Sequence, residues 1–94
     1  MATLYITEYQ SLDQHGLPID PPLAEQTVAI GGTSTQSSAF NANTRYLRLH
    51  TDAICSVLVG SNPTATAAKK RMADESTEWV QVAGGHKIAV ITNS

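Results

Sequence analysis

Hydrophobic and polar residues alternate along several short stretches of this 94-residue chain, and a two-residue period predicts β-strands. The clearest case is 46–51, where Leu47 and Leu49 alternate with polar or aromatic residues, so both leucines are expected in a core. The predicted strands are 4–9, 26–30, 46–51, 54–60, 78–82 and 87–91, with a further short edge strand at 37–40.

The stretch 54–60 differs from the others because both of its faces are mostly apolar. We expect this strand to be covered on both sides, with a second subunit as one candidate for the cover. It contains Cys55, the only cysteine, so no internal disulfide is possible and a reducing compartment is expected. A thiol in such a run is predicted to be a buried, unreactive core residue.

Glycines and prolines divide the strands. Residues 11–24 lose all periodicity and contain three prolines, which predicts an extended loop or arm, either lying along a neighbouring subunit or disordered. The Gly84-Gly85 pair between 78–82 and 87–91 predicts a β-hairpin, because glycine tolerates positive φ. Residues 64–74 alone have a helical composition, sufficient for one or two turns at most.

Together these features predict one all-β domain over 1–94. It is a small antiparallel β-sandwich or barrel, jelly-roll-like, of six to seven short strands with an extended proline-containing N-terminal arm.

The charge of the chain argues against a nucleic-acid partner. Six basic and eight acidic residues give a net charge of -2, and the one basic cluster, 69–71, is followed by Asp74 and Glu75. We read that cluster as a solvated surface and expect no nucleic-acid partner.

No apolar run approaches the roughly 20 residues of a membrane span, so a soluble, unexported chain is expected. Charged residues make up only 15% of the chain, and a low-charge surface with strand edges favours assembly.

No motif for catalysis or cofactor binding stands out. His15, His50 and His86 lack metal-ligand spacing, and neither glycine pair has the following helix and lysine of a phosphate loop. His50, Asp52 and Ser56 do not suggest a triad, because the chain turns near Asp52 and Ser56 lies within the next strand. Asp52 is expected to accept backbone amide hydrogens at that turn. We therefore predict no enzyme, no metal and no cofactor.

Most of the chain from about residue 26 resembles a group of small, mostly uncharacterised proteins that accompany the head genes of tailed bacteriophages and prophages. The segments that carry the resemblance are TRYLRLHTDAICS (44–56), GSNPTAT (60–66), RMA (71–73) and GGHKIAVI (84–91). These motifs are structural and specify no reaction.

The resemblance implies a virion structural protein, assembled in the host cytoplasm and located on the capsid surface. The expected function is that of a decoration (cement) protein that binds the major capsid protein as a homodimer or homotrimer. A tail or head-tail structural protein and a small cupin-like ligand-binding module are the alternatives. The candidate interface residues are Leu17, Pro18, Ile19, Pro21 and Pro22 of the arm, Asn62 and Pro63 of the turn after 54–60, and Trp79.

Overall fold

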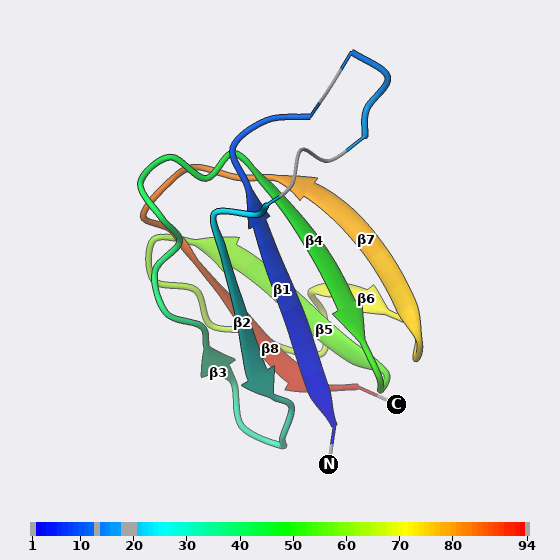
Figure 1. Cartoon of the computed structure of the whole chain (residues 1–94). Coiled ribbons are helices and arrows are strands. Elements are labelled where there is room, and N and C mark those ends of the chain that lie inside the picture. The colour runs from blue at the N-terminus through cyan, green and yellow to red at the C-terminus, as the bar shows by residue number, and fades with distance from the viewer. Residues whose placement is uncertain (1, 13, 18–20, 94) are drawn as a thin grey trace.

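Eight strands form two four-stranded antiparallel sheets in the computed structural model, which describes residues 2–12, 14–17 and 21–93 (Figure 1). The strands are β1 (Thr3–Tyr9), β2 (Ala24–Ala29), β3 (Thr35–Gln36), β4 (Tyr46–Thr51), β5 (Cys55–Gly60), β6 (Lys70–Met72), β7 (Ser76–Gln81) and β8 (Lys87–Thr92). The first sheet has the order β2-β1-β4-β7 and the second the order β3-β8-β5-β6. The predicted all-β sandwich is therefore confirmed, with eight strands rather than six or seven.

The strand order is that of a circularly permuted jelly roll, in which the strand that is eighth in the usual order comes first in this chain as β1. When the strands are counted from β2, with β1 placed last, the sheets read first-eighth-third-sixth and second-seventh-fourth-fifth. The start of β1 and the end of β8 lie close together, as this relation requires. Ala2 O accepts a hydrogen bond from Ile30 N, and Thr92 N donates one to the adjacent Gly31 O.

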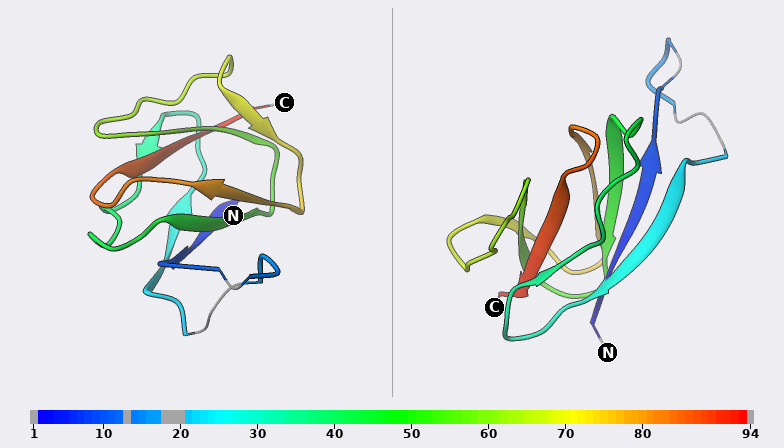
Figure 2. Two further views of the ribbon diagram at one scale, coloured as in Figure 1. Left: turned by 90° about the horizontal axis from the view of Figure 1, so that it is seen from above. Right: turned by 90° about the vertical axis from the view of Figure 1, so that its left-hand side faces the viewer.

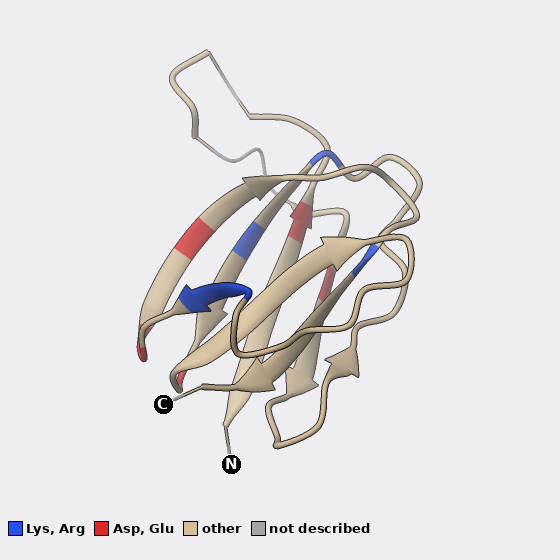
Figure 3. Cartoon of the chain, turned by 180° about the vertical axis from the view of Figure 1, so that it is seen from behind, with Lys and Arg blue, Asp and Glu red and all other residues tan. Residues whose placement is uncertain are grey.

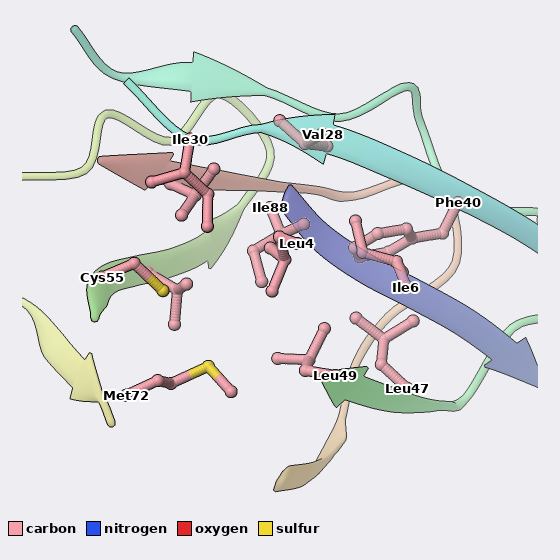
Figure 4. Packing of buried hydrophobic residues seen from close by; sticks show 12 residues of the cluster. Leu4, Ile6, Val28, Ile30, Phe40, Leu47, Leu49, Cys55, Met72 and Ile88 are labelled. Atoms are coloured by element: carbon pink, nitrogen blue, oxygen red, sulfur yellow. The ribbon is translucent and has the colours of Figure 1, made fainter. Parts of the chain in front are cut away.

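The two sheets pack face to face, as the turned views show (Figure 2), and enclose an apolar core. Leu47 and Leu49 are at most 1% exposed, so the core position predicted for both is confirmed. They pack with side chains of β1 against Ile88 and Met72 of the second sheet (Figure 4). The two-residue period produces this core because alternate side chains of each strand point to the same face.

Glu8 occupies a core-facing position of β1, in phase with Leu4 and Ile6, and is only 1% exposed. Its Oε1 accepts hydrogen bonds from Asn41 N and from Thr44 Oγ1, both at 2.8 Å, and its Oε2 accepts one from Gln26 Nε2 at 3.3 Å. A buried carboxylate needs such donors to offset its lost hydration. The side chain thereby fixes the connection between β3 and β4 against β1.

The predicted hairpin between 78–82 and 87–91 is wrong, because β7 pairs with β4 in the first sheet and β8 pairs with β5 and β3 in the second. The connection between them crosses from one sheet to the other. It forms a turn, in which His86 N donates to Ala83 O, and it also bonds to Phe40: Gly85 N donates to Phe40 O, and Phe40 N donates to His86 O. The glycines are still required, since Gly85 has φ of 82° and Gly84 lies against the backbone of Ala42.

Two other local predictions are corrected. Residues 64–74 contain no helical turn; they form an irregular loop followed by β6, because Met72 is buried opposite Cys55 on β5. The strand expected at 37–40 lies earlier, at β3, and Ser37 N still donates to Ile88 O beyond it.

The outer face of β5 is covered in part by the chain itself. Cys55 and Val57 face the core, whereas Ser56 on the opposite face is fully buried. Asn93 Nδ2 donates to Ser56 Oγ at 2.7 Å and to Ala67 O at 3.2 Å, so the loop after β5 is held over the outside of the strand. The predicted burial of Cys55 is confirmed, and desolvation raises the pKa of its thiol.

Glu8→Ala should lower the free energy of unfolding by about 2 to 4 kcal/mol, because Asn41 N and Thr44 Oγ1 would lose a charged acceptor in a buried site. Glu8→Gln should cost less, since one amide oxygen can replace Oε1. Urea denaturation would measure both, with the exposed Glu25→Ala as the control, expected within about 0.5 kcal/mol of the parent. Equal effects of Glu8→Ala and Glu25→Ala would contradict the structural role of Glu8.

Gly84→Ala should destabilise the chain by about 1 to 3 kcal/mol, because an added Cβ would clash with the backbone carbonyl of Ala42. Gly32→Ala is the matched control, as a Cβ there meets nothing within 4 Å. Thermal unfolding of the two variants side by side tests this, and a Gly84→Ala variant as stable as Gly32→Ala would refute the close approach.

Candidate interaction surface on the first sheet

The face of the first sheet that points away from the core carries most of the large aromatic side chains. We call it the outer face, and define it by the residues that alternate with the core positions. They are Tyr5, Thr7 and Tyr9 on β1, Glu25 and Thr27 on β2, Tyr46, Arg48 and His50 on β4, and Thr77, Trp79 and Gln81 on β7.

Two aromatic contacts organise this face. The rings of Tyr9 and Trp79 have centroids 5.6 Å apart at an interplanar angle of 36°, across the intervening strand β4. Tyr9 is 6% exposed under this contact, while Trp79 remains 44% exposed. Tyr5, which is 45% exposed, lies beside His50 on β4 with centroids 6.3 Å apart. Two large aromatic residues are thus held in place and still accessible to a partner.

The polar side chains between them are also positioned. His50 Nδ1 lies 2.8 Å from Thr77 Oγ1, and its Nε2 lies 3.4 Å from a carboxylate oxygen of Glu75. Glu75 has φ of 53°, a left-handed conformation at the turn before β7 that directs the chain into the strand. The imidazole is therefore fixed from both nitrogens and presents its ring beside Tyr5.

A shallow groove of about 630 Å³ runs over β2, β1 and β4 on this face. Tyr5, Thr7, Glu25 and Arg48 are among the residues that line it. Glu25, Thr7 and Arg48 are direct neighbours in one row across the sheet, and Trp79 ends that row. Trp, Tyr and Arg are the residue types that contribute most to protein interfaces, and this face carries exposed Trp79 and Tyr5 beside the half-buried Arg48.

The predicted interface residues are distributed over three regions. Trp79 lies on the outer face. The Asn62-Pro63 turn belongs to the second sheet, where Gln36 Nε2 donates to Asn62 Oδ1 at 2.9 Å and to Pro63 O at 2.7 Å. Asn62 is exposed but Pro63 is buried within the chain, so the turn offers little apolar surface. The structure does not bring this turn together with Trp79.

The arm projects from the end of the first sheet, between β1 and β2 (Figure 1). Leu17 is 60% exposed, Pro21 is exposed and Pro22 is partly buried, whereas Pro18 and Ile19 lie outside the described residues. The arm begins just after Tyr9, which contacts Trp79. Its base therefore adjoins the outer face, and the two form one continuous region.

Sequence reasoning missed Tyr5, Arg48 and His50 as members of one surface. Each is visible in the sequence as the residue that alternates with a core position. Their proximity depends on β1 pairing with β4 in a register that sets Tyr5 opposite His50 and Thr7 opposite Arg48. That pairing joins segments far apart in the chain, and no local signal encodes it.

Reactive groups are dispersed over the described part of the chain. His15 lies in the arm, His50 on β4 and His86 before β8, and the described residues include no group of three or more His, Cys, Asp or Glu placed to hold a metal ion. Asp52 accepts a hydrogen bond from Thr3 N at 2.6 Å, as expected of an amide acceptor, but it joins β1 to the turn after β4. The described residues contain no helix long and apolar enough to cross a membrane.

Comparisons with protein families, curated proteins and solved structures give no significant match to this chain. These comparisons therefore assign no function, and the outer face is the structural feature that bears on one.

Proposed function

We propose that this chain is a non-enzymatic structural protein of a tailed-phage virion, acting as a decoration protein that binds the outside of the capsid lattice. The observation that carries the proposal is the outer face of the first sheet, where exposed Tyr5 and Trp79 flank Arg48 on a rigid framework. The resemblance of stretches such as 44–56 to proteins that accompany phage head genes supplies the choice of partner.

The mechanism is adhesion. Aromatic residues held by strand pairing lose little conformational freedom on binding, so burying them against a partner gives a favourable free energy. The groove over β2, β1 and β4 would receive a projecting element of the major capsid protein, with Glu25 and Arg48 available to pair with its charges. The arm at the end of the same sheet would extend the contact to a neighbouring subunit.

Repeated over a lattice, such contacts would stabilise the joints between capsid subunits. Each copy needs only modest affinity, because linked copies bind the lattice with a high effective concentration. Homo-oligomerisation is thus part of the proposed mechanism.

Binding to empty capsids of the parent phage tests the proposal through co-sedimentation of the purified chain. Tyr5→Ala and Arg48→Ala should each weaken binding about tenfold or more, as truncated interface anchors do. Arg71→Ala is the matched control, since Arg71 is an exposed arginine on β6 of the other sheet and should leave binding unchanged.

Cryo-electron microscopy of the virion gives the independent measurement, with density for the sandwich expected on the outer capsid surface. A protein found only in the tail, or capsid binding that Arg71→Ala and Arg48→Ala reduce equally, would contradict the proposed role.

A further inference from the structure

The sandwich has four edge strands, and three of them carry protection against pairing with another chain. β3 has two residues and β6 three, and β6 also carries Lys70 and Arg71, visible as the basic strand in Figure 3. β2 carries the exposed carboxylate of Glu25, and its Gln26 side chain holds the segment after β3 beside the strand by bonding the backbone N and O of Ser38, at 3.0 and 3.2 Å. Short strands, edge lysines and covering segments are the devices by which natural sheets avoid edge-to-edge association.

β7 lacks this protection. It has six residues, with no proline, lysine or arginine among them. Its only charge is Glu78, which faces inward and pairs with Lys70 Nζ at 2.6 Å. An inward-pointing charge can itself discourage pairing at an edge, but Lys70 of the same chain compensates this one, so the edge remains open to a partner.

The backbone groups that face this open edge can be identified. Val82 N donates to Arg45 O at 2.8 Å, and these residues continue the register in which Tyr46 opposes Gln81. In an antiparallel ladder the hydrogen-bonded pairs alternate with pairs whose N–H and C=O groups point outward. Ser76, Glu78 and Val80 therefore bond to β4, and Thr77, Trp79 and Gln81 direct their backbone groups to the open edge.

We propose that β7 pairs antiparallel with β7 of a second copy, about a two-fold axis that passes through Trp79. In this register Thr77 lies opposite the partner's Gln81, and Trp79 lies opposite the partner's Trp79. Every outward N–H of one strand then meets an outward C=O of the other, which makes the edge self-complementary. The two first sheets become one continuous sheet.

The side chains of the outer face beside this edge also favour a second copy of the chain as the partner. Trp79 is 44% exposed in the single chain and contacts Tyr9 in a tilted ring arrangement. At the two-fold axis the tryptophans of both copies would be cross-strand neighbours and join their Tyr9 contacts into one aromatic cluster. A self-complementary register with an exposed aromatic residue on its axis favours a second copy over an unrelated strand. The inference rests on the homo-oligomeric part of the proposed function and assigns it an interface.

Light scattering across a concentration series of the purified chain should detect a dimer. Trp79 is the only tryptophan, so its fluorescence emission should shift to shorter wavelength with the same concentration dependence. Gln81→Pro removes an N–H that faces the partner and should weaken the dimer about tenfold or more, while proline is tolerated at such an edge position. Thr27→Pro, at an outward-facing position of β2, is the matched control and should leave the dimer intact.

A second pair of variants covers the case in which Gln81→Pro fails to fold. Trp79→Lys sets two like charges opposite each other on the axis and should abolish the dimer, whereas Tyr5→Lys changes the other exposed aromatic residue of the outer face and should preserve it. A monomer at every concentration, a trimer, or a dimer that survives Trp79→Lys would overturn the proposal. Because no capsid is present in these measurements, their failure is distinguishable from a failure of capsid binding.

Discussion

The carboxylate of Glu8 is the constraint on which the arrangement of the first sheet depends. It is buried at the end of β1 and bonded by donors from Gln26 on β2 and from Asn41 and Thr44 in the connection to β4. A buried ion tolerates few alternative arrangements of its donors, since losing any of them exposes the full cost of desolvation. One side chain thereby holds the ends of three adjacent strands together and fixes where β4 enters the sheet.

The position of β4 in the first sheet determines which residues lie in the middle of the outer face. β4 supplies Arg48 and His50 to the middle of the outer face, between the Tyr5 side of β1 and the Trp79 side of β7. The core positions of the same strands are closely packed leucines and isoleucines, so the outer side chains are carried on a rigid support. A rigid array of aromatic and charged side chains suits a protein that works by contact, because little order remains to be acquired on binding.

The sequence was informative wherever the signal is local. Alternation at 46–51 identified both the strand and its buried leucines, and alternation at 4–9 identified the strand in which Glu8 is in phase with Leu4 and Ile6. It failed where the answer depends on which strands meet. The Gly84-Gly85 pair has the chemistry of a hairpin turn, yet the same residues serve equally in a crossing between sheets, and only the preference of β7 for β4 distinguishes the two. Met72 likewise draws 70–72 into a strand through its contact with the core, which overrides a weak helical composition.

The position of β8 has a kinetic consequence. It pairs with β5 on one side and β3 on the other, so β3 joins the rest of the second sheet only once the last strand in chain order is inserted. The first sheet similarly needs β4 before β1 is paired on both sides. Contacts between distant segments must form before either sheet closes, and such topologies fold slowly. During this interval β5, whose residues are mostly apolar, is unpaired along one edge, and strands exposed in this way during folding are prone to aggregate.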